Sequence, residues 1–173
     1  MIKYLLNSRT GEKTNFKTAL RYGVVGSSYA FSFDCENSEL FSAYSEDNEP
    51  IYLGDVVEVF IGIGKNPRKY YEIEVAPNGT KFFAEITNDG GDLKVKFSQV
   101  EIKTEVERFK NGYKATIYIP ETLFSNRGKK ELYFNAFRIE TEGGETEKNL
   151  LALSPTLSDT FHDPSKFIPL EED

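Results

Sequence analysis

Short runs of β-branched and aromatic residues, separated at fairly regular intervals by turn-forming residues, limit most strongly how this chain can fold. Within these runs the apolar residues either alternate with polar ones or occur in brief apolar bursts. Alternation with a period of two is typical of strands, and helical periodicity is scarce. The sequence therefore predicts an all-β fold with little helix.

We expect about ten strands, with boundaries accurate to about two to four residues. The expected strands cover Tyr29 to Cys35, Leu40 to Tyr44, Val56 to Ile63, Tyr70 to Ala76, Lys81 to Ile86, Lys94 to Phe97, Glu101 to Phe109, Tyr113 to Ile119, Leu132 to Glu140 and Leu150 to Leu153. A single helical turn is expected at 120–124, because proline suits the first position of a helix.

Two Asn-Gly pairs predict how some of these strands connect. Asn78-Gly79 and Asn111-Gly112 each lie between two β-rich runs. Asn-Gly readily adopts the positive φ angles of a tight hairpin turn, so each pair should join antiparallel neighbours. A parallel sheet would need crossover helices that the sequence does not supply. These features favour a two-sheet antiparallel β-sandwich of the immunoglobulin-like or jelly-roll kind.

Length and charge restrict the partners. The 173 residues, 39% of them hydrophobic, suit a single sandwich domain over residues 1–173. The net charge of −7 repels phosphate backbones and anionic lipid headgroups, so we expect neither nucleic acid nor membrane as a partner. The first apolar run is too short for a signal peptide. We therefore expect a cytoplasmic location, unless the chain is an excised or matured part of an exported protein; the oligomeric state is left open.

The residues that most enzyme classes need are sparse. The chain has one Cys and one His, which excludes an internal disulfide and a Cys/His zinc cluster. It contains neither a Gly-x-Ser-x-Gly elbow nor a glycine-rich phosphate loop. We therefore expect no catalytic residues and no cofactor. One alternative stays open, because the oxygen-rich loop Asp47-Asn48-Glu49 could hold a structural calcium ion.

Three glutamates within expected strands are harder to interpret. Alternation puts Glu58 on one strand face with Phe60, and puts Glu72 and Glu74 on one face with Tyr70. Such a face could be a solvated exterior, a sugar-binding surface, or the carboxylate pair of a glycoside hydrolase. The chain has 10 Tyr and 14 Phe but no Trp. Tyrosine combines a ring that can stack on a sugar with a hydroxyl that can hydrogen-bond.

Several segments, in order, resemble carbohydrate-binding module family 9-like domains of the DOMON-like sandwiches. The segments are 55–61, 70–80, 112–120, 135–139, 154–156 and 161–167, and the resemblance spans about Ala30 to Leu170. It implies a β-sandwich that binds sugars without catalysing a reaction. The resemblance also implies a set of ligand-binding positions: Glu58, Tyr71, Glu72, Tyr113, Asn135, Arg138 and His162.

Two features of the sequence modify this assignment. Asn135 and Arg138 are three residues apart in one strand, so they should point to opposite faces. One of them could then be structural, for example Arg138 paired with a buried carboxylate. Tyr113 stands where related modules commonly have tryptophan, so stacking would come from Tyr or Phe. Our leading hypothesis is a non-catalytic module for an oligosaccharide or polysaccharide. The alternatives are a protein-interaction or structural sandwich and, with less support, a glycoside hydrolase.

Overall fold

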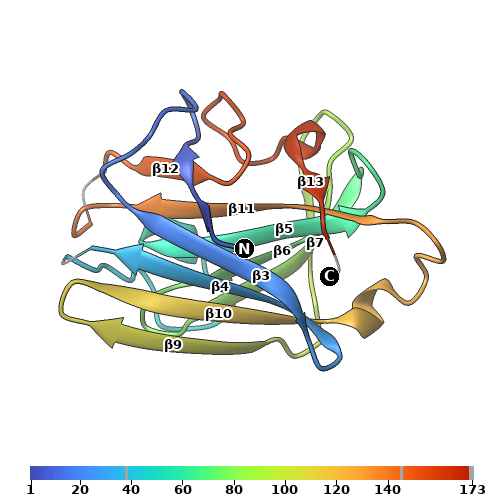
Figure 1. The fold of residues 1–173 in the computed structure, drawn as a ribbon, viewed down its shortest axis with the longest axis horizontal. Helices are drawn as coiled ribbons and strands as arrows, with labels where there is room; N and C mark the ends of the chain where they lie inside the picture. The colour runs from blue at the N-terminus through green and yellow to red at the C-terminus, as the bar shows by residue number, and fades with distance from the viewer. Residues whose placement is uncertain (38, 145, 172–173) are drawn as a thin grey trace.

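A computed structural model describes residues 1–37, 39–144 and 146–171. Two antiparallel sheets face each other (Figure 1), which confirms the predicted all-β sandwich. The helical elements in this part of the chain are short 3₁₀ turns. None of the helices in these ranges has the length and apolar character needed to cross a bilayer.

The described residues form thirteen strands and three 3₁₀ turns. The strands are β1 (Lys3–Tyr4), β2 (Leu6–Asn7), β3 (Thr18–Val25), β4 (Ser28–Glu36), β5 (Val56–Ile63), β6 (Lys69–Val75), β7 (Lys81–Thr87), β8 (Lys94–Phe97), β9 (Lys103–Phe109), β10 (Gly112–Pro120), β11 (Leu132–Glu140), β12 (Asn149–Ala152) and β13 (Ile168–Pro169). The turns are η1 (Ile51–Leu53), η2 (Glu121–Phe124) and η3 (Pro164–Lys166), and η2 confirms the single turn expected after Pro120.

The two sheets differ in size and in strand order. The five-stranded sheet has the order β1-β3-β4-β10-β9. The eight-stranded sheet has the order β2-β12-β11-β5-β6-β7-β8, with β13 also paired to β11. Strands far apart in the sequence, such as β5 and β11, are therefore direct neighbours. This crossing between the sheets brings residues from the middle and the end of the chain onto one surface.

Both Asn-Gly pairs connect antiparallel neighbours, as predicted. The first lies between β6 and β7, and the second between β9 and β10. Gly112 is required by close packing as well as by the turn. A Cβ atom on this residue would lie 2.0 Å from the carbonyl oxygen of Cys35, closer than any stable contact.

One expected strand is absent, and four of the observed strands, β1, β2, β3 and β13, were not expected. The stretch from Leu40 to Tyr44 forms no strand. Asp55 holds it instead, since its backbone N–H donates to the Phe41 carbonyl and its Oδ2 accepts from the Phe41 N–H. Strand β3 was missed because Arg21 and Gly23 interrupt its apolar pattern. It nevertheless turns Thr18 and Leu20 inward, where both are buried.

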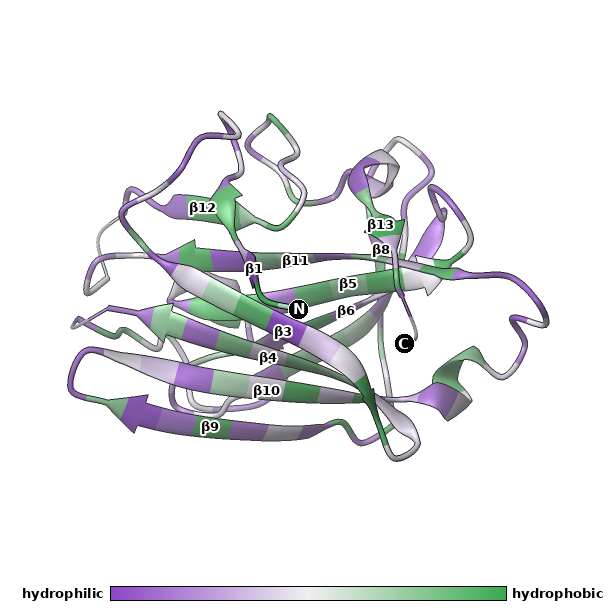
Figure 2. Cartoon of the chain, in the orientation of Figure 1, coloured by the Kyte–Doolittle hydropathy of each residue, from purple (hydrophilic) through white to green (hydrophobic). Residues whose placement is uncertain are grey.

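Apolar residues cover both faces of the eight-stranded sheet. One cluster fills the space between the sheets and includes Phe31, Val59 and Phe134. A second cluster lies on the outer face and includes Phe60 and Phe161. Figure 2 shows the resulting hydrophobic run along β5, whereas the edge strand β9 is largely hydrophilic. The chain segment near the C-terminus covers part of this outer face, where Phe161 and Phe167 join the second cluster.

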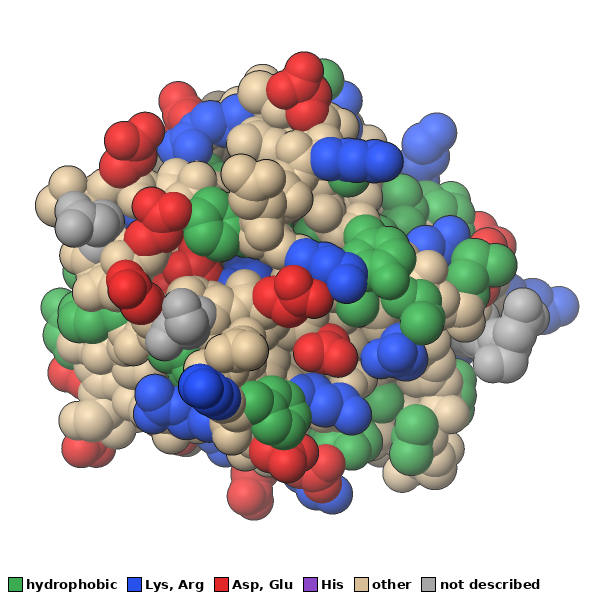
Figure 3. Space-filling model, turned by 60° about the vertical axis from the view of Figure 1, so that its left-hand side comes forward, with side chains coloured by type: hydrophobic (Ala, Val, Ile, Leu, Met, Phe, Trp, Pro, Cys, Tyr) green, Lys and Arg blue, Asp and Glu red, His purple; other side chains and the backbone are tan. Residues whose placement is uncertain are grey.

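Charged side chains are mixed on the surface shown in Figure 3. Acidic and basic groups alternate there, and no large area of one sign is visible. The acidic excess of the sequence is therefore not concentrated on this face of the molecule. The unusual acidic feature of the protein is instead a buried one.

Candidate functional site

Strand register brings three glutamates together on the outer face of the eight-stranded sheet. In the β5–β6 pair, Glu58 lies opposite Glu74 and Phe60 lies opposite Glu72. Directly paired residues of an antiparallel ladder project to the same face. This arrangement confirms the predicted grouping of Glu72 and Glu74 on one face, and adds Glu58 from the neighbouring strand.

The glutamates lie in a groove of about 440 Å³. The central strands contribute Phe60 and the three carboxylates. Strands on either side of them, together with η1 and nearby loops, contribute the rest of the lining. These residues are Phe82, Leu93 and Val95 on the β7–β8 side, Ile139, Lys148 and Leu150 on the β11–β12 side, Tyr52 from η1, and Arg9 and residues 159–162 from loops. The groove thus combines apolar walls with a polar centre, as small-molecule sites commonly do.

Burial strongly affects the three carboxyl groups. Glu58, Glu72 and Glu74 are 2%, 8% and 0% exposed. Burial, which disfavours the charged form, raises the pKa of Glu72 to about 7 and raises the pKa of Glu58 and Glu74 well above the usual value. Repulsion between Glu58 and Glu74 raises the pKa of Glu74 further. At neutral pH this cluster therefore attracts protons or cations.

His162 stands at one end of the groove and is fixed from two sides. Its Nδ1 lies 2.8 Å from the Tyr70 hydroxyl, and its carbonyl oxygen accepts a hydrogen bond from the Asn88 amide. Its ring centroid is 5.0 Å from that of Phe60. Burial lowers the pKa of His162 to about 4, so the ring is neutral at physiological pH.

The groove also carries an exposed aromatic ring and charged side chains. Tyr52 is 43% exposed. Lys148 lies beside it, since its Nζ is 5.7 Å from the ring centroid and donates to the Tyr52 carbonyl oxygen at 2.6 Å. Nε of Arg9 forms an ion pair with Asp159 at 2.5 Å. An exposed ring beside hydrogen-bonding groups suits a ligand that has both an apolar face and hydroxyls.

Neither a protein-family model nor a curated protein matches this sequence. Solved structures match over the whole chain. One, from Bacteroides uniformis ATCC 8492, is described as a candidate carbohydrate-binding protein. It shares 15% identity with a TM-score of 0.80, and the alignment covers 100% of this chain and 86% of the other.

Two further structures are of a carbohydrate-binding module family 9 domain from Caldicellulosiruptor kristjanssonii. Its complex with cellotriose has a TM-score of 0.67 at 16% identity, with coverage of 100% and 83%. Its glucose complex has a TM-score of 0.67 at 15% identity, with coverage of 99% and 84%. The chain has the fold of carbohydrate-binding module family 9. The family 9 resemblance in the sequence is confirmed at the level of the fold.

Within this family 9 fold, three of the seven predicted ligand-binding residues line the groove: Glu58, Glu72 and His162. Tyr71 projects to the opposite face of β6. Its ring packs against Phe83 and Phe124, and it lines a separate groove at the edge of the space between the sheets. Tyr113 is 0% exposed within the core between the sheets.

Asn135 and Arg138 lie on opposite faces of β11, as their spacing predicts. On the outer face, the Asn135 side chain donates to the Ser154 carbonyl at 2.7 Å and accepts from the Ser154 N–H at 3.0 Å. On the inner face, fully buried Arg138 pairs with buried Glu140 and donates to the Thr18 hydroxyl. Both side chains therefore make contacts that hold the fold together, and the suggested pairing of Arg138 with a buried carboxylate is present.

The oxygen-rich loop at 47–49 has internal partners. Oδ1 of Asp47 accepts from the Lys81 N–H, and Oδ1 of Asn48 accepts from the Phe83 N–H. These bonds tie the loop to the start of β7. A calcium ion at this loop stays a prediction.

Several groove residues were missing from the predicted set, namely Tyr52, Glu74, Lys148 and Phe161. The alternation that places Glu72 on the outer face places Glu74 there too, so that signal was present in the sequence. Lys148 and Phe161 carry no comparable local signal. They reach the groove because β12 and the segment after it pack beside β11, far from β5 in the sequence.

Proposed function

We propose that this protein is a non-catalytic carbohydrate-binding module that holds an oligosaccharide, or a segment of a polysaccharide, in the groove on its eight-stranded sheet. The observation that carries the proposal is an exposed Tyr52 ring in the same groove as three carboxyl groups, Lys148 and His162. A sugar ring presents an apolar face and several hydroxyls, and this groove offers a partner for each.

Apolar contact in the groove comes from several side chains. Tyr52 and Val95 are exposed, and Phe82 and Phe161 keep small exposed areas. The hydroxyls of a sugar would find donors in Lys148 and acceptors in Glu72 and Asp159. In this proposal tyrosine takes the stacking role, and Tyr71 and Tyr113 support the fold.

The shared fold gives separate support for a saccharide ligand. A family 9 module of the same fold has been solved with cellotriose and with glucose. Glucose and cellotriose are therefore the first ligands to test. A shallow groove of this kind should bind with a dissociation constant between about 1 μM and 1 mM, or about −8 to −4 kcal/mol.

The burial of the carboxyl groups supports binding over hydrolysis. A glycoside hydrolase needs two carboxyl groups that both reach the scissile bond. Glu74 is fully buried and Glu58 nearly so, so both lie beneath the surface that a sugar would contact. We therefore propose that their role is to shape and charge the groove.

A glycan array, followed by calorimetry with glucose, cellotriose and any array hit, tests this proposal. The array is run with and without calcium, and with free and blocked reducing ends. We expect Tyr52→Ala and Lys148→Ala each to weaken binding at least tenfold, because the first removes the stacking ring and the second removes the proposed donor to the sugar hydroxyls. Tyr4→Ala is the matched control, because Tyr4 is also exposed but lies on the five-stranded sheet, and it should bind as the unchanged protein does.

Two results would contradict the proposal. No binding to any glycan by a well-folded sample would favour a protein-interaction sandwich. Release of the aglycone from aryl glycosides, lost in Glu58→Gln, would favour a hydrolase.

A further inference from the structure

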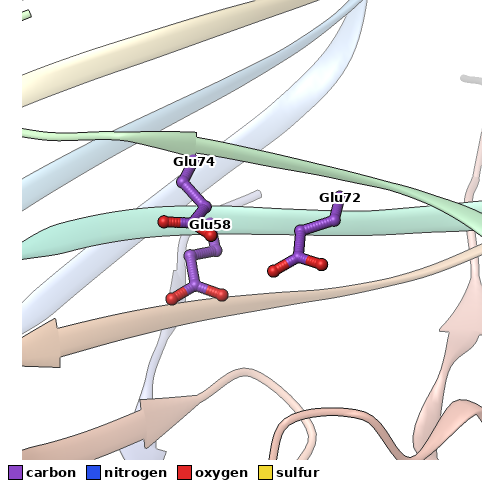
Figure 4. A group of neighbouring side chains, drawn as sticks. All are labelled: Glu58, Glu72 and Glu74. Carbon is purple, nitrogen blue, oxygen red and sulfur yellow. The ribbon is translucent and has the colours of Figure 1, made fainter. Parts of the chain in front are cut away.

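Glu58, Glu72 and Glu74 have a geometry that goes beyond hydrogen bonding to a ligand. One carboxylate oxygen from each residue lies within 4.8 Å of the others. Figure 4 shows the three side chains on the same side of adjacent strands β5 and β6, with their carboxylates gathered together. Carboxylates from one rigid sheet are thus held close, although like charges repel one another across a ladder.

Several of these oxygens lack the hydrogen bonds that buried polar atoms normally have. Oε1 of Glu58 and both carboxylate oxygens of Glu74 are buried and have no hydrogen-bond partner outside the cluster among the described residues. Leaving a buried acceptor unpaired costs roughly 1–3 kcal/mol, and more when it is charged. Fully buried Glu74 has one oxygen within 4.8 Å of an oxygen of each of the other two carboxylates, so the cluster has a deficit of positive charge.

Nearby side chains supply only part of that charge. Of the cationic residues lining the groove, Arg9 is paired with Asp159, and Lys148 donates its hydrogen bond to the Tyr52 carbonyl. With all three carboxylates ionised, the cluster carries −3, and Lys148 brings the local sum to −3 + 1 = −2. A divalent cation would make that sum zero.

We propose that Glu58, Glu72 and Glu74 form a binding site for a divalent cation, with Ca²⁺ as the preferred ion, at the floor of the groove. Calcium binds oxygen at about 2.3–2.6 Å, so two oxygens on opposite sides of one ion are about 4.6–5.2 Å apart. Oxygens within 4.8 Å of one another can therefore share a single calcium ion. Calcium takes six to eight oxygen ligands, and water or ligand hydroxyls on the groove side complete the set.

The proposal is tested with the metal alone, so its outcome does not depend on sugar binding. The full chain is treated with a chelator, freed of it, and titrated with CaCl₂ by calorimetry at pH 8. We expect one calcium ion per chain and a rise in melting temperature on adding calcium.

Isosteric variants locate the site. Glu74→Gln and Glu72→Gln should each weaken calcium binding at least tenfold, and each removes a buried charge without changing side-chain size. Glu107→Gln is the matched control, because Glu107 is exposed on β9 of the other sheet. It should change the affinity less than twofold.

Three results would overturn the proposal. One is the absence of both heat and thermal stabilisation at millimolar calcium. Another is full retention of calcium binding in Glu72→Gln and Glu74→Gln. The third is loss of binding in Asp47→Asn with retention in Glu74→Gln, which would locate the ion at the 47–49 loop.

Discussion

Glu58 and Glu74 face each other directly across the β5–β6 ladder, and both are buried. Most sheets avoid like charges in this position, because the pair is repulsive and its desolvation is costly. Here the pKa of each carboxyl group is raised by burial and by its acidic neighbours. The sheet therefore holds a group that responds to protons and cations at the centre of the proposed binding groove.

The first prediction concerns stability against pH in the absence of metal. The three carboxyl groups keep their protons to higher pH in the folded chain than in the unfolded chain, so the free energy of unfolding should fall as pH rises from about 4.5 past 7. For Glu72 alone, the shift to a pKa of about 7 corresponds to roughly 3–4 kcal/mol.

His162 changes the free energy of unfolding with pH in the opposite direction, and over a different pH range. Its pKa falls to about 4 on folding, so its contribution is lost as pH drops from about 6.5 to 4. Because three carboxyl groups contribute against one imidazole, the free energy of unfolding should still fall as the pH rises. Urea unfolding at pH 5, 6.5 and 8 measures this pH dependence, and Glu74→Gln should make it weaker. A stability that rises between pH 6.5 and 8 would contradict this account.

The second prediction concerns the Tyr70–His162 hydrogen bond, which joins β6 to the segment before η3. Tyr70→Phe removes the hydroxyl and leaves the largely buried His162 without this partner. We expect a loss of about 1–2 kcal/mol in the free energy of unfolding. Tyr118→Phe is the control, because its hydroxyl bonds Glu105 at the surface, and it should have little effect. Equal effects from the two variants would argue against a special role for His162.

The local sequence pattern predicts much of the candidate site, but it does not predict all of it. Because strand side chains alternate with a period of two, the sequence alone places Glu72 and Glu74 on one face and separates Asn135 from Arg138. The same alternation aligns Tyr71 with Ile73 and Val75, which marks its face as the inner one. That signal was outweighed by the family 9 resemblance, which implied a ligand-binding Tyr71.

The local sequence pattern does not show which strands pair when they lie far apart in the chain. Strand β5 is buried on both faces, so its apolar run does not distinguish the core from the groove. The position of Lys148 depends on β12 pairing with β11, and that of His162 depends on a covering segment near the end of the chain. These contacts follow from topology, which no short motif specifies.

The third prediction separates a structural role of Arg138 from a ligand-binding one. Arg138→Met removes the cation that neutralises buried Glu140, which then keeps only the neutral donors Asn37 and the Glu142 N–H. This loss should cost about 3–5 kcal/mol. Adding Glu140→Gln should restore part of that loss, because the charge is removed. Saccharide affinity of the folded double variant should be unchanged, since Arg138 lies on the inner face. Loss of affinity in a stably folded double variant would show that Arg138 contributes to binding.

The fourth prediction concerns the β9–β10 turn. Gly112→Ala would force a Cβ against the Cys35 carbonyl oxygen, which lies 2.0 Å away, at a φ of +154°. Strands β4 and β10 would have to separate at this point, so we expect a loss of more than about 2 kcal/mol in the free energy of unfolding. Gly91→Ala is the matched control, because its Cβ would meet no atom within 4 Å. Since the turn belongs to the five-stranded sheet, saccharide and calcium affinities of folded Gly112→Ala should stay unchanged, and a loss of either would mean that the two sheets are coupled through the core.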